Sequence, residues 1–441
     1  MISKLRLWLI NHKNVVKMSR FSLLTLLLLL ISWFFDHRFV ELKSIIPDSL
    51  LLPLDVSLTF LSNISGVFLT ISIFALTTII TVLNKYSSSV TPRMAQDFID
   101  RADVLTLHGI FVGGFFYCVI SLFMLQNVEG SQRVISGTLG IIYSIISMIG
   151  FVVFSQRVLH NLKMSNIIEN VSGDCDKLID EELELRNQAR RFDINCVSSS
   201  QDILAEKTGY LFDIAFDDLL KIIQQIEGCK AELLISRHIG EYTPEGSVLA
   251  SLNFFECPAL NEEMSSELQK KLSACFVINI FKNEKEDYHH EMVKLSEIAL
   301  MALSPGINDP NTAIICINKL STLLGKLFSS GTQYIVVREK GESKIVYQNY
   351  SVDEELYLLF SQIMACTNGD PLVSEAILEG LYMIYMLSGE EARQPAGQFF
   401  EVAFSILMED FKNDFHRKRL KSIRENMELQ LGQVKEQSSE G

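Results

Sequence analysis

Four apolar segments near the start of the chain constrain its fold more than any other feature. None of them contains Asp, Glu, Lys or Arg, and they run over Phe21–Phe35, Leu58–Leu83, Leu107–Leu125 and Val134–Phe154. A helix needs about 20 apolar residues to cross the hydrocarbon core of a bilayer. The last three segments reach that length, and flanking residues whose polar ends reach the interface can complete the first. The sequence therefore predicts a multi-pass α-helical membrane domain with four spans over residues 1–165.

Basic residues accumulate on alternate sides of these segments. Five precede the first segment and three lie between the second and third, whereas the other two loops hold two and one. In chain order they are Lys4, Arg6, Lys13, Lys17, Arg20, Arg38, Lys43, Lys85, Arg93, Arg101 and Arg133. Because short loops rich in Lys and Arg stay in the cytoplasm, we expect both termini to be cytoplasmic. Residues 1–16 mix basic and apolar side chains, which predicts a short interfacial helix.

Charge divides the chain after the last apolar segment. Residues 1–165 hold 13 Lys+Arg and 8 Asp+Glu, whereas residues 166–441 hold 26 Lys+Arg and 45 Asp+Glu. An acidic domain repels nucleic-acid phosphates, so no nucleic-acid partner is expected. The eight cysteines include no C-x-x-C pair, which argues against a zinc site and against a disulfide framework. Their spacing fits a reducing compartment.

The acidic part of the chain changes its pattern twice. Residues 166–191 keep a helical period, which predicts a connector helix, and residues 286–441 read mainly as helices with a hairpin at Gln333–Tyr347. Residues 192–285 are predicted to be β-rich. The strands expected there are Ile194–Val197, Ala231–Ile235, Ser247–Leu252 and Ala274–Phe281. The membrane domain is therefore expected to be followed by an α+β cytoplasmic domain.

The second apolar segment carries hydroxyl groups on one helical face. Thr70, Thr77 and Thr81 recur at spacings of seven and four residues, which places them on one side of a helix. Small and hydroxyl side chains let membrane helices approach and hydrogen-bond, so packing explains this face. The alternative is that copies of the face line an aqueous path, with these threonines as candidate conduit-lining residues. In the third segment, Gly109 and Gly113 fit a close helix crossing.

A turn from Ser304 to Pro310, rich in Pro, Gly, Asn and Asp, separates two predicted helices. Asp309 is placed to cap the second helix, and Pro310 suits its first position. Capping explains the turn without any ligand. The alternative is a site for a small ligand or ion at the helix N-terminus, formed by the polar groups of Ser304, Asn308, Asp309 and Thr312.

No motif identifies a catalytic or metal centre. His289 and His290 are adjacent, so on a helix they point to different faces and the pair alone cannot chelate an ion; no metal is expected. The GxSxG, HExxH, P-loop and GxGxxG fingerprints are missing from the sequence. Enzymatic activity is therefore not favoured, and the sequence assigns no cofactor.

Several motifs spread over the chain carry a resemblance to a known family. They are Thr91-Pro92-Arg93, Gly109-Ile110-Phe111-Val112-Gly113, Gly209-Tyr210-Leu211, the hairpin glycines Gly240 and Gly246, and the run from Ala302 to Pro310. With these motifs the chain resembles a bacterial family of predicted membrane proteins, the domain of unknown function number 2254. The resemblance implies a protein of the bacterial cytoplasmic (inner) membrane. It supplies no reaction, substrate or ligand.

The chain departs from this family's pattern ahead of the Ala302–Pro310 run. The family has an Arg-Thr pair there, and then an acidic residue followed by Phe-Gly. In this sequence the corresponding positions read Lys282-Asn283, Asp287 and His290-Glu291. A function that needs the family's Arg, or its Phe-Gly backbone, is therefore not expected to carry over.

Three functions fit these observations. The leading hypothesis is an oligomeric membrane protein whose cytoplasmic domain senses a small ligand or ion and whose spans form a conduit or a signalling core. Its expected partners are membrane lipid and further copies of the chain. The second hypothesis is a membrane-anchored enzyme that uses Ser304, Asn308, Asp309 and Lys282. The third is a scaffold whose tail recruits a cytoplasmic partner.

Overall fold

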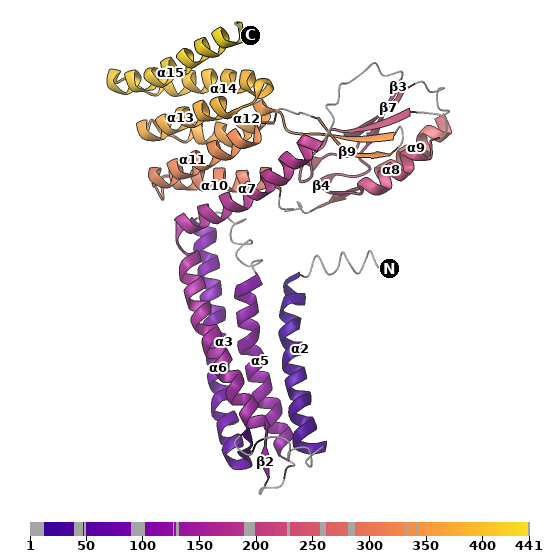
Figure 1. Ribbon diagram of the computed structural model, residues 1–441, viewed down its shortest axis with the longest axis vertical. Helices are drawn as coiled ribbons and strands as arrows, with labels where there is room; N and C mark the ends of the chain where they lie inside the picture. The colour runs from indigo at the N-terminus through magenta and orange to yellow at the C-terminus, as the bar shows by residue number, and fades with distance from the viewer. Residues whose placement is uncertain are drawn as a thin grey trace. The chain divides into compact units, whose positions relative to one another are not determined.

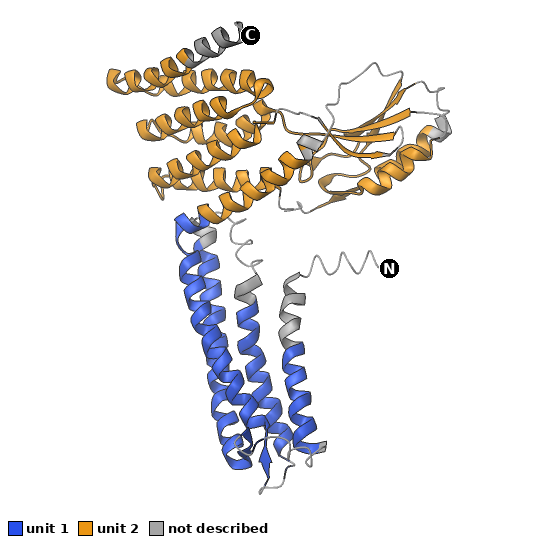
Figure 2. Ribbon diagram, in the orientation of Figure 1, with its two compact units in different colours: residues 1–167 blue, residues 168–441 orange. Residues whose placement is uncertain are grey.

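The computed structural model divides the chain into two compact units, residues 1–167 (unit 1) and residues 168–441 (unit 2), coloured separately in Figure 2. Residues 1–12, which include most of the predicted interfacial helix, lie outside the described residues. The structure describes residues 13–38, 47, 50–89, 102–126, 128, 132–188, 199–226, 230–255, 262–280, 287–330, 334–340 and 343–439.

Unit 1 is built from long apolar helices that pack side by side (Figure 1). Its elements are α2 (Lys13–Trp33), the π-helix η1 (Phe34–Arg38), β1 (Leu52–Pro53), α3 (Leu54–Ser89), α5 (Ala102–Leu125), β2 (Arg133–Val134) and α6 (Ser136–Asn161). Within the described ranges, three helical segments are long and apolar enough to cross a membrane, namely Leu54–Lys85, Thr106–Leu125 and Ser136–Asn161. Leu23–His37 is apolar but shorter. Three of the four predicted spans are therefore confirmed as helices of spanning length.

The helices of unit 1 approach closely where α5 and α6 carry glycine. A Cβ atom on Gly113 would lie 2.5 Å from Oγ1 of Thr25 in α2 and 2.6 Å from the hydroxyl oxygen of Tyr143 in α6. A Cβ atom on Gly140 would lie 2.7 Å from a methyl group of Leu61 in α3. Side chains at these positions would force the backbones apart. The close crossing predicted for the third apolar segment is confirmed at Gly113.

One carboxylate ties the end of the first apolar segment to the start of the last. Asp36, in η1, accepts hydrogen bonds from the backbone N–H groups of Ile135 (2.9 Å) and Ser136 (3.2 Å) and from the Ser136 hydroxyl. These N–H groups stand at the start of α6, where the helix itself offers no acceptor. Asp36 is buried, so the capping contact also satisfies a carboxylate that has left water.

Unit 2 combines two small sheets with a series of helices (Figure 1). Its first helix is α7 (Met164–Gln188), most of which belongs to this unit. The strands are β3 (Ser199–Leu204), β4 (Gly209–Ile214), β5 (Lys230–Ile235), β6 (Tyr242–Thr243), β7 (Val248–Phe255), β8 (Phe276–Asn279), β9 (Tyr334–Lys340) and β10 (Ser343–Gln348). The other helices are α8 (Phe216–Gln224), α9 (Glu262–Ser273), α10 (Tyr288–Leu303), α11 (Pro310–Leu327), α12 (Val352–Ala365), α13 (Pro371–Leu387), α14 (Glu390–Glu409) and α15 (Asp414–Ser439).

The larger sheet has the strand order β3-β7-β5-β10-β9, and the smaller has the order β6-β4-β8. β10 runs parallel to β5, and the other neighbouring strands are antiparallel. Both sheets and α8 bury one apolar core that includes Leu211, Leu219, Ile223, Leu233 and Leu252. Removing these side chains from water stabilises the fold, because each buried Leu or Ile contributes about 1.5–3 kcal/mol.

Most of the predicted strands are present. β5, β7 and β8 overlap three of the four strands expected within residues 192–285, whereas Ile194–Val197 lies outside the described residues. The hairpin predicted at Gln333–Tyr347 is confirmed by β9 and β10. It does not stand apart among the helices, because β10 pairs with β5 and extends the larger sheet.

Short polar side chains fix where the helices of unit 2 begin. Asp287 accepts a hydrogen bond from the N–H of His290 (2.6 Å) at the start of α10, and Asp309 accepts one from the N–H of Thr312 (3.2 Å) at the start of α11. Ser351 and Glu354 form a capping box on α12. Each contact supplies an acceptor for an N–H that lacks an internal partner. The predicted cap at Asp309 is therefore confirmed.

Candidate ligand-binding site

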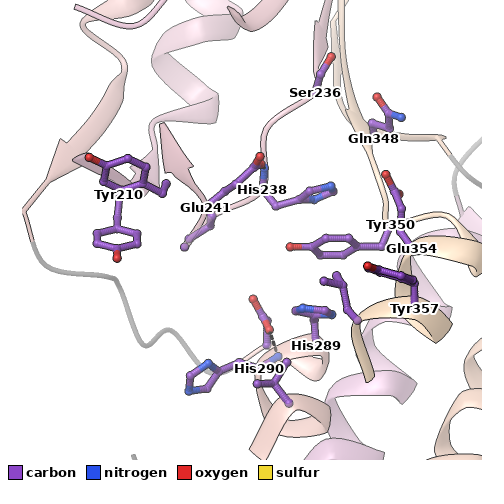
Figure 3. A pocket seen from close by; sticks show the side chains of 16 residues that line it. Tyr210, Ser236, His238, Glu241, His289, His290, Gln348, Tyr350, Glu354 and Tyr357 are labelled. Carbon is purple, nitrogen blue, oxygen red and sulfur yellow. Dashed lines mark hydrogen bonds between the residues drawn. The ribbon is translucent and has the colours of Figure 1, made fainter. Parts of the chain in front are cut away.

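Unit 2 contains a cavity of about 590 Å³ at the start of helices α10 and α12 (Figure 3). Its lining comes from Tyr210 in β4, from β6 and the loop between β5 and β6, from the first turns of α10 and α12, and from the end of β10 with the loop that follows it. The caps described above set the position of both helix starts, so they also set the walls of the cavity. A volume of this size suits a small organic molecule.

A column of three rings forms one wall of the cavity. Tyr350 lies between His238 and His289, with ring centroids 3.7 Å and 4.3 Å apart and interplanar angles of 15° and 18° (Figure 3). His238 comes from the loop after β5, Tyr350 from the loop after β10, and His289 from the first turn of α10. The stack therefore joins three segments that are distant in sequence.

A buried carboxylate supports the column from behind. Glu355 in α12 is 0% exposed, and its Oε2 lies 2.7 Å from Nδ1 of His289. Its other oxygen, Oε1, has no hydrogen-bond partner among the described residues. The contact with Glu355 engages Nδ1 of His289, and Nε2 is the other ring nitrogen. The pair fixes the orientation of the His289 ring and brings a negative charge close to the cavity.

The other end of the column is held by the loop that carries His238. The backbone N–H of His238 donates to Oε2 of Glu241 (3.0 Å), and the Tyr347 hydroxyl lies 3.3 Å from Nδ1 of His238. Glu241 also pairs with Arg237. Burial lowers the pKa of His238, although the Glu241 carboxylate opposes the shift. His238 is therefore neutral near pH 7 and stacks on Tyr350 without the cost of burying a cation.

Behind the cavity, the first turn of α10 contacts α7. Tyr288 lies between two lining residues of the cavity, Asp287 and His289. Its hydroxyl accepts a hydrogen bond from Nη2 of Arg186 (3.4 Å), and the Arg186 guanidinium stands 5.9 Å from the Tyr288 ring centroid. Arg186 is buried and pairs with Glu182 at 2.8 Å. A buried, hydrogen-bonded charge of this kind fixes the register between two helices.

The polar residues at the turn before α11 serve local structure and do not line this cavity. The side chain of Asp309 accepts hydrogen bonds from both the N–H and the hydroxyl of Thr312 (3.2 and 2.6 Å), and the Ser304 hydroxyl donates to the carbonyl of Met301. Asn308 adopts a positive φ of 49°, which the short polar side chain of Asn tolerates. These contacts bring the four residues into one turn. Ligand binding there stays a prediction.

The three candidate conduit residues lie on the exposed face of α3. The hydroxyls of Thr70, Thr77 and Thr81 each donate to the backbone carbonyl four residues earlier, at 2.8–2.9 Å. This local bond satisfies a hydroxyl in an apolar solvent without any water. A role in a conduit therefore stays a prediction, and the arrangement is equally compatible with lipid or with another copy of the chain on this face.

Sequence reasoning missed most of the cavity. His289 and His290 stand out in the sequence, but their spacing was considered only for metal binding. In the described part of the chain, no group of three or more His, Cys, Asp or Glu could hold a metal ion. His238, Tyr350 and Glu355 carry no motif. The usable signals were Asp287 as a helix cap ahead of two histidines, and Ser351 as a second cap beside Tyr350.

Of the positions that depart from the family pattern, Lys282 and Asn283 lie outside the described residues.

Comparison with known proteins agrees with the membrane character of the chain. Two mycobacterial relatives, Uncharacterized protein Rv1290c of Mycobacterium tuberculosis and Uncharacterized protein Mb1321c of Mycobacterium bovis, are each 23% identical over 349 residues, which is 76% of this chain. The match covers 66% of the length of these relatives. No solved structure matches the chain significantly. The family described as "Predicted membrane protein (DUF2254)" matches over residues 13–383, and the chain belongs to this family of membrane proteins of unknown function.

Proposed function

We propose that this protein is a membrane-bound sensor. In this proposal unit 2 lies in the cytoplasm and binds a small ligand in the cavity beside the His238–Tyr350–His289 column. The bound state then acts through α7 on the helices of unit 1, which span the inner membrane four times and form the signalling core of a homo-oligomer. The segment Leu23–His37 serves as the first span, completed by flanking residues that reach the interface.

The observation that carries this proposal is the hydrogen bond that links the cavity-lining turn of α10 to Arg186 of α7. Asp287 and His289 line the cavity, and Tyr288 between them bonds to Arg186. In sequence, only two residues separate the end of α6 at Asn161 from the start of α7 at Met164. A change at the start of α10 therefore reaches the helix that directly continues the last apolar segment.

Further ion pairs hold α7 to unit 2. Lys326 in α11 pairs with Asp176 (2.6 Å) and Asp180 (2.7 Å) of α7, and Lys319 pairs with Glu169 (2.7 Å). Each exposed pair contributes little by itself. Together with the buried Arg186 they make α7 move with α10 and α11 as one body, which is what transmission from the cavity needs.

The cavity supports binding better than catalysis. Two of its carboxylates are committed to structure, because Asp287 caps α10 and Glu354 belongs to the α12 capping box. The third, Glu241, pairs with Arg237. His238, His289 and His290 also line the cavity, and a neutral imidazole is a competent base, so catalysis is the second candidate. The enzyme and scaffold hypotheses are therefore second to sensing.

Filling the cavity with a side chain tests transmission without knowledge of the natural ligand. We expect Val293→Trp, on the cavity wall, to slow backbone hydrogen exchange across residues 168–188 of the full chain in detergent by roughly threefold or more. The matched control is Val402→Trp on the exposed face of α14, away from the cavity. Val293→Leu repeats the test with a smaller side chain in case the tryptophan variant does not fold.

The route itself is tested by removing Arg186. Combining Val293→Trp with Arg186→Met should weaken the response of α7 to the filled cavity, because the bond to the Tyr288 hydroxyl is gone while the bond from Cys175 to the Tyr288 carbonyl and the ion pairs to α11 remain. If Val293→Trp changes exchange in α10 and α12 while α7 stays at its wild-type rate, the cavity does not communicate with α7. That result would contradict the sensor proposal.

A further inference from the structure

We infer that the ligand of this cavity is a small organic cation, recognised by tyrosine ring faces and by acidic side chains, with no Lys or Arg among the described residues of the lining. The inference rests on the proposed sensing function and adds the chemical class of what is sensed.

The charge of the lining is negative. Of the 16 residues that line the cavity, Asp287, Glu241 and Glu354 are acidic, and none is Lys or Arg. The guanidinium of Arg237 offsets only Glu241. Behind His289 stands Glu355, which is fully buried and has an oxygen without a hydrogen-bond partner in the described part of the chain. An anionic ligand would be repelled by this set, whereas a cation is attracted.

The aromatic lining offers faces to a cation. Both faces of the Tyr350 ring are covered by the histidines, so this ring belongs to the wall. Tyr210 and Tyr242 meet edge to face, with centroids 5.2 Å apart, and Tyr242 remains 55% exposed. Tyr357 on the opposite side is 65% exposed. Cations bind over such ring faces through the quadrupole of the ring, and quaternary ammonium groups are recognised in this way.

Size separates an organic cation from a bare metal ion. A cavity of about 590 Å³ is far larger than the coordination sphere of a single ion. The described residues contain no group of three or more His, Cys, Asp or Glu that could coordinate a metal. The acidic and aromatic groups instead surround a space that holds a molecule with a charged head and an apolar body.

The histidines of the column make binding of a cation depend on pH. A proton on His238 or His289 adds positive charge to the cavity wall, so protonation and cation binding oppose each other. The titratable groups that act on these two rings are Glu241, Tyr347, Tyr350, Glu354 and Glu355. Arg237 pairs with Glu241, and Asp287, His290 and Tyr357 stand elsewhere in the lining. Cation affinity should therefore rise with pH through the histidine range.

Three molecules of one shape and different charge test the inference. Choline is the cation, 3,3-dimethylbutan-1-ol is its neutral isostere, and 3,3-dimethylbutanoate is the anion. The reporter is Tyr357→Trp at the cavity, placed in the full chain with Trp8→Phe and Trp33→Phe, because these are the two native tryptophans. Its fluorescence then comes from the cavity alone, and tryptophan keeps an aromatic face at this position.

We expect choline to bind at least about tenfold more tightly than the neutral isostere, and its affinity to rise roughly 3- to 10-fold between about pH 5.5 and pH 7.5. Tyr242→Leu should weaken choline about tenfold while Tyr382→Leu, away from the cavity, leaves it unchanged. Val293→Phe, which fills the cavity without adding a second tryptophan, should abolish the response to choline and so assign it to the cavity.

The outcomes separate this inference from the proposed function. Tighter binding of the neutral or anionic molecule, or no saturable binding of choline at any pH, overturns the cation assignment. Either result leaves the sensor proposal standing if Val293→Trp still slows exchange in α7. If choline binds as expected but α7 does not respond to the filled cavity, the cation site is upheld and the sensing function fails.

Discussion

At the scale of single residues, Glu232 is a carboxylate whose environment changes its chemistry. It lies in β5, the central strand of the larger sheet, opposite Asn253 in β7 and Lys344 in β10. It is 6% exposed, and its Oε1 has no hydrogen-bond partner within the described ranges. Burial raises the pKa of Glu232 to about 7, although Lys344 and a hydrogen bond with Asn253 oppose the shift.

This shift predicts a pH-dependent gain from Glu232→Gln. The folded protein holds the proton more tightly than the unfolded chain, so the wild type loses stability as pH rises from about 4.5 to about 7, and stays lower above that. Gln cannot ionise, so at pH 8 the variant should be more stable by about 1–3 kcal/mol, and at pH 4.5 it should match the wild type. Thermal melting of unit 2 at both pH values measures this. Glu245→Gln, at an exposed position, is the control and should change melting at neither pH.

Single residues could be predicted from the sequence where their role is local. Asp309 caps α11 as predicted, because a cap depends only on the next three residues. The column of His238, Tyr350 and His289 could not be predicted, since ring stacking between two loops and the first turn of a helix leaves no characteristic spacing in the sequence. Glu355 reads as one more acid in the first turn of a helix, and only the fold shows that it is buried against His289.

At the scale of elements, the packing of unit 1 depends on glycines whose neighbours belong to other helices. Gly113 of α5 faces Thr25 and Tyr143, whereas Gly66 of α3 has no atom within 4 Å of where its Cβ would stand. Both glycines lie in apolar helices and look equivalent in sequence. The structure separates a packing glycine from one on an open face.

We therefore expect Gly113→Leu to destabilise unit 1 and Gly66→Leu to leave its folding intact. The larger side chain at Gly113 overpacks the contact with α2 and α6, at a cost of about 1–3 kcal/mol. Thermal unfolding of the two variants in detergent measures the difference. Equal melting temperatures would mean that the α2–α5–α6 contact does not stabilise the unit. A change in oligomer size confined to Gly66→Leu would place a second copy of the chain on the open face of α3.

Elements were more predictable than their pairing. The apolar period identifies the long helices of unit 1, and short β-branched runs identify β5 and β7. The sequence does not reveal that β10 pairs in parallel with β5, because that pairing joins segments separated by several helices. The sequence also does not reveal the length of the first apolar helix. Asp36 and His37 can either mark the end of the membrane segment or belong to it, with their polar ends at the interface.

At the scale of the whole molecule, the distribution of charge predicts one orientation in the membrane. The proposal places unit 2 in the cytoplasm and the turn between α5 and α6 on the opposite side. Native cysteines are poor reporters because Cys175, Cys275 and Cys316 are buried. Exposed positions have to be chosen instead.

An impermeant thiol reagent applied to intact cells should label Arg133→Cys and spare Lys177→Cys, both of which replace exposed side chains. Once the membrane is permeabilised, both variants should react, and the parent protein measured alongside gives the background. Labelling of Lys177→Cys from outside, with Arg133→Cys protected, would reverse the orientation. Protection of both sites in intact cells would mean that α6, which lies between them in sequence, does not carry the chain across the membrane.

The contact between Asp36 and α6 has a consequence for how the protein is made. During synthesis the first apolar helix leaves the ribosome about 100 residues before its partners Ile135 and Ser136 exist. Until then the carboxylate lacks these three hydrogen bonds, and burying it without them is costly. The first helix therefore cannot reach its final depth until the last one arrives. Stable insertion of the first helix therefore depends on α6, the last helix of unit 1 to be made. In a chain that stops after α5, the first helix should be less stably inserted.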